Sequence, residues 1–283
     1  MIRIGFLTMM LFMSLLSVAQ QRAQIKVGYD YEVNVSGSVR RADYILLSGQ
    51  QGSLFYNPTA LWMDVISKDD AARQAYGALA SKLQESGRGN EVPNRSNSMY
   101  VAKDFDKQEK TVYDDYSDQF AVYNEPFAEM EWEVVADSTK TILGYECVMA
   151  RSLYHGRDWT AWFAPEIPVH DGPWKFSGPP GLILKATESK GMHSFTANGI
   201  ETTDAEIPAM VRADWYHTED RIKYLQSQYK YIQDPLTDIM GGNLPANARI
   251  VVNGKETTAE EVRVASRKTL DSGFDFLETD YHK

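Results

Sequence analysis

Apolar and polar residues alternate along much of this chain with the two-residue period of a β-strand. At positions 25–35 the odd residues are apolar or aromatic, and the even residues are polar or glycine. Such alternation is typical of a strand with one face on a core and the other in water. Residues 44–47 and 53–56 flank the glycine-containing segment 49–52, and this arrangement predicts a hairpin.

Further strand patterns follow one another closely and are separated by short polar segments. Strands are expected at 99–105, 110–116, 119–123, 130–134, 141–154, 159–163, 182–188 and 192–200, with a turn at 138–140. Strands joined by short turns pair in antiparallel fashion, and a sheet of this size twists strongly. The pattern therefore predicts an α+β fold, in which one curved antiparallel sheet, a half-barrel meander, carries a few helices on its concave side.

A period of 3.6 residues predicts three helices. Ser67 is a candidate N-cap for the first, which ends near Gly87. The apolar face of this helix consists of Ala72, Tyr76, Leu79 and Leu83. The second helix begins at Thr218 and ends before Pro235, and the third spans 259–270. The aromatic residues that follow are expected to dock back onto the fold; they are Phe274, Phe276 and Tyr281.

The segment 161–186 interrupts the strand pattern, and we expect the rest of the fold to be arranged around it. Five prolines between positions 165 and 180 remove backbone donors, so this segment cannot form an interior strand or a helix. Large apolar residues in and beside it indicate a shaped loop that packs on the body of the protein. We expect Trp162, Trp174 and Phe176 to cluster over one end of the sheet.

A structural turn is expected where this proline loop ends. Gly178 and Gly181 bracket Pro179 and Pro180. The two prolines fix the backbone, and Gly181 admits a conformation that a residue with a Cβ atom avoids. The turn should therefore be rigid and should set the register of the strand that begins at Leu182.

Three motifs in this region carry a resemblance to a known family. WFAPEIP at 162–168, GPWKF at 172–176 and GPPGLIL at 178–184 are similar to the signature of the GLPGLI family of exported bacterial proteins. The resemblance extends back through Trp132 and forward to about Ile200, and Pro179 stands where the family usually has leucine. The family has no established activity, so the resemblance implies location and fold rather than function. The implied architecture is similar to that of periplasmic lipoprotein carriers.

The first 19 residues have the pattern of a secretory signal peptide. Arg3 precedes an apolar run, and Ser17, Val18 and Ala19 provide the small residues that a signal peptidase reads. We expect a single GLPGLI-like domain at 20–283, with an additional C-terminal segment from about 235. No later segment is apolar enough to span a bilayer, so a periplasmic or outer-membrane-associated location is expected.

The net charge and the cysteine content exclude some kinds of binding partner and some kinds of covalent chemistry. The chain has 39 acidic and 29 basic residues and a net charge of −10, which disfavours a nucleic-acid partner. Cys147 is the one cysteine of the sequence, so an internal disulfide is excluded. Because its sequence neighbours include no basic residue, it is interpreted as a small buried hydrophobe and not as a nucleophile.

The sequence offers no convincing catalytic, metal or cofactor site. Glu166, His170 and Asp171 lie close together in the proline loop, but adjacent residues on an extended backbone point apart. We interpret them as solvated loop residues. The histidines lack the short spacings of metal ligands, and no cofactor motif is present.

The function favoured by the sequence is therefore binding and not catalysis. The first hypothesis is an exported protein that binds an apolar small molecule or lipid in a sheet concavity, and its marker is a cavity too large for side chains to fill. The second is an accessory partner of an outer-membrane uptake or assembly system, with an exposed aromatic patch around Trp174. A hydrolase is the third. The candidate ligand-binding residues are Trp162, Phe163, Trp174, Phe176 and Leu182.

Overall fold

The computed structural model of the protein describes residues 21–95, 98–116, 119–127, 130–236, 244–252 and 255–282, without the side chain of Lys255. The expected signal peptide lies outside the described residues. Among the helices of the described part, none has both the length and the apolar character that crossing a membrane requires.

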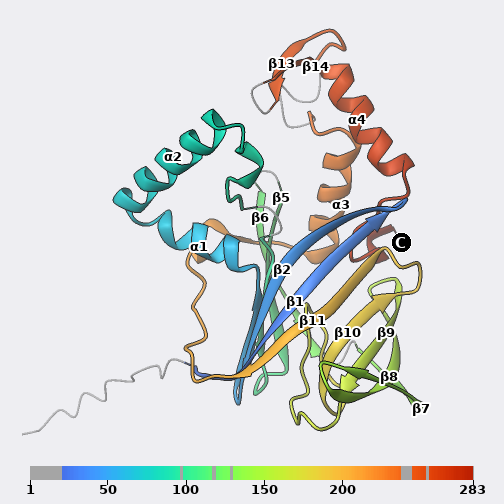
Figure 1. The fold of residues 1–283 in the computed structure, drawn as a ribbon. Coiled ribbons are helices and arrows are strands. Elements are labelled where there is room, and N and C mark those ends of the chain that lie inside the picture. The colour runs from blue at the N-terminus through green and yellow to red at the C-terminus, as the bar shows by residue number, and fades with distance from the viewer. Residues whose placement is uncertain are drawn as a thin grey trace, which may run out of the picture.

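Twelve strands form one large curved antiparallel sheet, as the alternation predicts (Figure 1). Their order across the sheet is β12-β6-β5-β4-β3-β2-β1-β11-β10-β9-β8-β7, and β12 and β6 are the one parallel pair in it. In chain order the strands are β1 (Ala23–Val35), β2 (Ser38–Gly49), β3 (Gly52–Tyr56), β4 (Tyr100–Asp104), β5 (Glu109–Tyr116), β6 (Gln119–Pro126), β7 (Glu133–Ile142), β8 (Tyr145–Tyr154), β9 (Arg157–Ala164), β10 (Leu182–Glu188), β11 (His193–Thr202) and β12 (His217–Thr218).

The first strand, β1, lies in the middle of this sheet, and later strands are added on both of its sides. It runs outward from β1 to β6, crosses to the opposite edge at β7, and returns to β11, which pairs with β1. Residues from both halves, such as Val112 and Tyr123 on one side and Ala150 and Trp159 on the other, belong to one buried cluster. The sheet therefore curls around this face, which is its concave face, without closing into a barrel.

Several strand boundaries differ from the sequence prediction; β2, for example, begins at Ser38 and not at Tyr44. β7 begins at Glu133, so Met130 and Trp132 precede the strand instead of alternating within it. The expected turn at 138–140 is wrong, because the pairing of β7 with β8 continues through an irregularity between Val135 and Thr139. The chain reverses at Leu143 and Gly144, which both have positive φ.

The helices lie on both sides of the sheet (Figure 1), which corrects the expectation that they cover only the concave face. They are α1 (Pro58–Ile66), α2 (Asp70–Glu85), α3 (Arg221–Gln233) and α4 (Ala259–Asp271). α1 was not predicted; Asn57 caps it and Pro58 starts it. It packs through Ala60 on a second cluster with Leu54 and Tyr100, which point away from the concave face.

The other helix ends show where cap residues decide a boundary. Asp69, and not Ser67, caps α2, and no residue of α2 is buried, so its predicted apolar face does not pack on the core. Asp220 caps α3, and a capping box between Thr258 and Glu261 starts α4. α4 follows a small hairpin of β13 (Arg249–Val252) and β14 (Lys255–Thr258).

The proline loop packs on the concave face, between β9 and β10. Its Trp174 and Phe176 are fully buried in the main cluster. Lys103 on β4 donates from its buried Nζ to Asp171 Oδ1 at 2.6 Å, to Gly172 O at 2.8 Å and to Phe176 O at 2.7 Å. The interpretation of Asp171 as a solvated residue was therefore wrong: it is a buried partner that fixes the loop to the sheet.

The C-terminal tail docks back onto the fold, as its aromatic residues predict. Tyr281 in the short helical turn Asp280–His282 is buried in the main cluster, and Phe276 packs against the same cluster. The tail follows α4 and returns over the concave face beside α3. Its main-chain nitrogen at Thr279 donates to His155 O at 2.8 Å. The tail thereby becomes a wall of the space described next.

Candidate functional site

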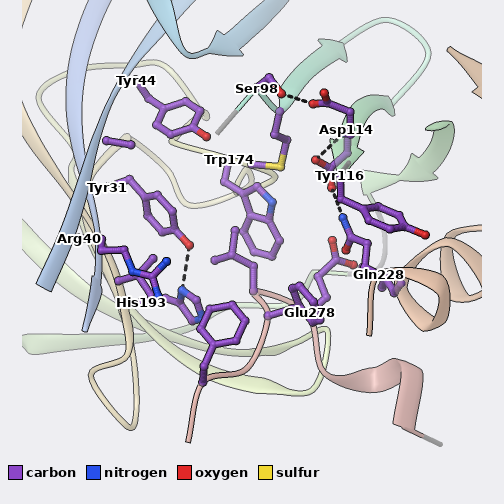
Figure 2. A pocket seen from close by; sticks show the side chains of 18 of the residues that line it. Tyr31, Arg40, Tyr44, Ser98, Asp114, Tyr116, Trp174, His193, Gln228 and Glu278 are labelled. Atoms are coloured by element: carbon purple, nitrogen blue, oxygen red, sulfur yellow. Dashed lines mark hydrogen bonds between the residues drawn. The ribbon is translucent and has the colours of Figure 1, made fainter. Parts of the chain in front are cut away.

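A cavity of about 540 Å³ lies between the concave face, α3 and the tail (Figure 2). β1 and β2 supply Tyr31 and Tyr44, and β5 supplies Asp114. The proline loop contributes Trp174, and α3 contributes Leu225. His193 of β11 and the tail also line the cavity, so segments far apart in the sequence form it together, and its volume falls in the range of small-molecule sites.

Most of the cavity wall is aromatic or aliphatic. The rings of Tyr31 and Tyr44 meet edge to face at 6.0 Å. The hydroxyl of Tyr31 lies 2.9 Å from His193 Nδ1. Burial, and then the charge of Arg157, lower the pKa of His193 to about 4, so this ring is neutral at pH 7. The remaining apolar lining includes Val33, Met99, Phe274, Phe276 and Leu277.

A carboxylate enters this wall from β5. Asp114 accepts from its neighbour's backbone, Asp115 N, at 2.9 Å and from Gln228 Nε2 of α3 at 3.3 Å. Burial raises the pKa of Asp114 to about 7, and the charges of Asp115 and Glu278 add to the effect, which Lys175 partly opposes. Asp114 therefore changes its protonation state near neutral pH.

One buried polar group at the cavity lacks a hydrogen-bond partner in the described residues. Trp174 is fully buried, and its indole Nε1 makes no hydrogen bond within the described residues. In Figure 2 the nitrogen edge of the indole is turned toward the side of the cavity that holds Gln228. Buried donors are nearly always satisfied, so an orphan N–H at a cavity wall needs an explanation.

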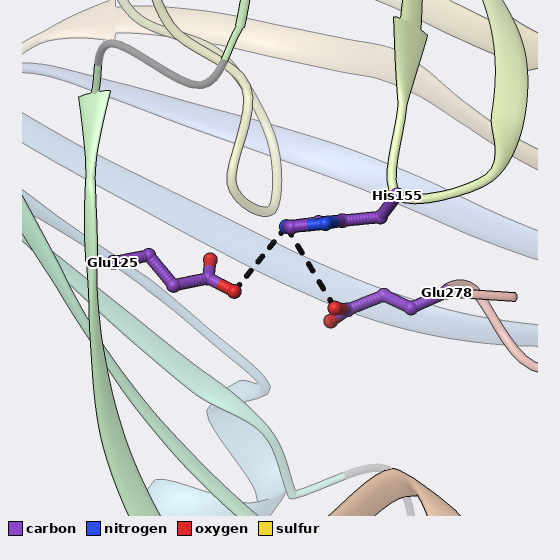
Figure 3. Close-up of side chains that lie close together, drawn as sticks. All are labelled: Glu125, His155 and Glu278. Atoms are coloured by element: carbon purple, nitrogen blue, oxygen red, sulfur yellow. Dashed lines mark ion pairs between the residues drawn. The ribbon is translucent and has the colours of Figure 1, made fainter. Parts of the chain in front are cut away.

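Beneath the cavity, charged residues from distant segments meet in one buried cluster, which we call the C-terminal clasp. Lys175 Nζ lies 2.9 Å from Glu125 Oε1 and also donates to Glu278 of the tail. His155 Nε2 lies 3.2 Å from the same Glu125 oxygen (Figure 3). The complete clasp consists of Glu125, His155, Lys175, Arg221, Glu278 and Asp280.

The clasp is close to electrical balance when its histidine is protonated. Burial opposes protonation of His155, but hydrogen bonds to Asp280 and Glu125 outweigh it and raise its pKa. For Glu125, burial opposes ionisation, but the charges of Lys175 and His155 prevail and lower its pKa. Three carboxylates thus face Lys175, Arg221 and the imidazolium, so the clasp attaches the tail to both halves of the curled sheet.

Three clasp residues also have the donor atoms of a metal site. Glu125, His155 and Glu278 each offer one ligand atom, and these atoms lie within 4.8 Å of one another. Lys175 and Arg221, however, contact the same two carboxylates. A metal ion there would meet two fixed positive charges and would have to displace them. The donor set therefore suits the protein's own cations better than a metal ion.

The five candidate residues from the sequence occupy different environments. Trp174 lines the cavity, whereas Phe163, Phe176 and Leu182 are buried in the core behind it. Trp162 lies on the opposite face of β9, with Lys140 Nζ 4.9 Å from its ring centre. Trp174 and Phe176 do cluster, at 5.1 Å between ring centres, but Trp162 makes no ring contact with them in the described part of the chain.

The structure also places the residues of the expected turn and the three polar residues of the proline loop. Gly181 N donates to Pro179 O at 2.8 Å, and Gly181 has a φ of 153°. Glu166 and His170 are exposed while Asp171 is buried, so these three residues do not converge on one point. Cys147 is fully buried, and burial raises the pKa of its thiol, as expected for a small hydrophobe.

Sequence reasoning missed most residues of the cavity. Alternation in β1 placed Tyr31 on the inner face, but Asp114 and Leu225 had no signal that linked them to Tyr31 across the sequence. Because the side chain of Asp114 is charged, the sequence favoured a position in solvent for it. The one usable hint was the period of β5, where Lys110, Val112 and Asp114 share a face.

The segment that forms the proline loop also carries the family match. A family model described as "Protein of unknown function (Porph_ging)" matches residues 152–185. The match runs from the end of β8 through β9 and the proline loop into β10. It agrees with the resemblance stated above, which rests on the same region, and it assigns no activity. The comparison with curated proteins finds no match.

Several solved structures are similar to this chain at low identity. A structure of PNGF-II has 14% identity and a TM-score of 0.47, covering 74% of this chain and 34% of that chain. MucB in complex with MucA(peri) has 11% identity and a TM-score of 0.31, with 69% and 54% covered. A putative outer membrane lipoprotein-sorting protein domain from Vibrio parahaemolyticus has 6% identity and a TM-score of 0.26, with 68% and 89% covered. The chain spans about a third of the PNGF-II chain.

Proposed function

We propose that this protein is an exported, non-enzymatic binding protein of the cell envelope that holds an apolar small molecule or lipid in the concavity of its sheet. The observation that carries the proposal is the cavity of about 540 Å³ with a largely aromatic and aliphatic wall. Burial of an apolar ligand against such a wall is favourable at roughly 25 cal/mol per Å² of area removed from water. The secretory pattern of the first 19 residues supports the location.

The alternative, an accessory partner of an outer-membrane system, had an exposed aromatic patch around Trp174 as its marker. Trp174 is fully buried, so this residue offers no docking surface. The hydrolase hypothesis had Glu166, His170 and Asp171 as its best candidates, and their separation removes its support. The binding hypothesis is therefore favoured over both.

A cavity-filling variant tests the proposal. Ala42 lines the cavity, so Ala42→Trp places a large side chain in it. Leu153 is 71% exposed on β8, and Leu153→Trp is the matched control. The probe is N-phenyl-1-naphthylamine, a neutral apolar dye whose fluorescence rises on leaving water. We expect saturable binding to the wild type and to Leu153→Trp, and loss of that binding in Ala42→Trp. Equal binding to all three folded proteins would place the dye outside the cavity and contradict the proposal.

A further inference from the structure

The partly buried carboxylate of Asp114 is unlike the buried carboxylates near the concave face. Glu125 is paired with Lys175, Glu278 with Arg221, and Asp171 with Lys103. Asp114 makes no ion pair within the described residues, although it points from β5 to the same side as the fully buried Val112. It has one backbone donor and one amide donor, which leave most of its charge uncompensated.

The groups around Asp114 suit a ligand with a positive charge and an apolar body. The rings of Tyr31, Tyr44 and Trp174 line the same cavity, and aromatic rings attract cations as well as apolar groups. The net charge of −10 favours the approach of cations.

We propose that the cavity takes an amphiphilic amine, a molecule with an apolar body and a protonated amino group that binds to Asp114. This inference rests on the proposed function, because it names the class of ligand for the same cavity. An anionic amphiphile fits less well. Arg40 and Arg41 are the cations at the exposed rim, and Arg41 is paired with Glu32, whereas Asp114 lies on the wall without an ion pair in the described residues and repels an anion.

Three probes with one chain length test the charge preference. Decylammonium, decanol and decanoate are titrated into the protein at about pH 8, below the concentrations at which they form micelles, with calorimetry as the readout. A charge-assisted hydrogen bond favours decylammonium over decanol by about tenfold or more. Asp114→Asn keeps the shape and should abolish this preference while decanol still binds. Asp137→Asn removes a charge from an exposed position on β7 and should leave the preference unchanged.

The pH dependence supplies a test on the wild-type protein alone. Asp114 must be ionised to bind an ammonium group, so affinity for decylammonium should fall as pH decreases from about 8 to about 5.5, and affinity for decanol should not. The charged or titratable groups that act on Asp114 are Asp115 on the same strand, Glu278 of the tail, Lys175 of the proline loop, and four tyrosines from β1, β2, β6 and α3, namely Tyr31, Tyr44, Tyr123 and Tyr224.

The possible results separate the two proposals. If decanol or decanoate binds the wild type as tightly as decylammonium, or if Asp114→Asn keeps the preference for decylammonium, the inference is wrong and the cavity remains a general apolar site. If no decyl probe and no neutral dye binds, the proposed function itself fails. A preference that depends on Asp114 and disappears at low pH supports the inference.

Discussion

At the scale of single residues, backbone conformation and buried charge explain why the proline loop holds its shape. Gly181 approaches the backbone of Ala164 so closely that an added Cβ would lie 2.3 Å from Ala164 O. Asp171 has its carboxylate buried against Lys103 and also accepts from Ser48 Oγ at 2.8 Å. The close approach of Gly181 to Ala164 and the pair of Asp171 with Lys103 each fix the loop to a strand. A substitution at either position should therefore change the stability of the protein.

Gly181→Val should destabilise the protein by about 1 to 3 kcal/mol, because the new side chain meets a fixed carbonyl and the backbone conformation is unfavourable. Gly199→Val is the matched control, since no atom lies within 4 Å of its Cβ position. Pro179→Leu, which restores the residue usual in the resembled family, should be nearly neutral. Urea unfolding measures all three. A Gly181→Val protein that unfolds at the wild-type midpoint would show that turn geometry does not hold the motif.

Asp171→Asn should destabilise by about 3 to 5 kcal/mol, because it leaves the ammonium group of Lys103 buried without a counter-charge. Glu166→Gln makes the same chemical change at an exposed position of the same loop and should cost less than about 0.5 kcal/mol. Thermal unfolding of the two variants compares them directly. Equal losses would mean that the Lys103 pair does not anchor the loop.

These residue-scale features differ in how far the sequence could predict them. The glycine and proline pattern indicated a special backbone conformation at Gly181, but it gave no sign of the close approach to Ala164. The role of Asp171 was misjudged, because its partner lies 68 residues away on β4. A carboxylate in a loop is usually solvated, and only tertiary contact shows the exception.

At the scale of elements, the C-terminal tail is held by the clasp, and this attachment should depend on pH. The raised pKa of His155 means that the folded protein binds a proton more tightly than the unfolded chain does. The stabilisation is complete below the unfolded pKa, about 6.5, and is lost as pH rises through the higher folded value. Glu125 and Asp280, with lowered pKa values, lose their contribution on the acid side instead.

The stability difference between the wild type and His155→Gln should therefore be largest near pH 6 and should shrink as pH rises to about 9. Urea unfolding at several pH values measures this difference. His170→Gln, at an exposed position of the proline loop, is the control and should follow the wild-type curve throughout. A His155→Gln difference that grows with pH would contradict the protonated clasp.

Element boundaries were predictable where the signal is local and periodic. The sequence predicted β10 at 182–188, as observed, and gave the ends of α3 and α4 to within a few residues. α1 was missed although Asn57 and Pro58 carry a helix-start signal, because its nine residues are too few to show a clear helical period. α2 shows the converse: an apolar period need not be buried.

At the scale of the whole molecule, the crossing from β6 to β7 makes the cavity possible. β6 and β7 follow one another in the chain but lie near opposite edges of the sheet, so the sheet curls and brings β5 and β6 toward the turn between β8 and β9. Local patterns predicted one curved antiparallel sheet, and the structure confirms it. They could not predict the pairing of β1 with β11, because strand alternation specifies a face but not a neighbour.

The central claim, that the concavity holds an apolar small molecule, is tested most directly by native mass spectrometry of the protein purified from its own envelope. We expect the wild type to carry a bound small molecule that is released on unfolding. Ala42→Trp should carry none, whereas Leu153→Trp should retain it. Wild-type protein that emerges without a small molecule, or bound instead to another protein with its cavity unoccupied, would contradict the account.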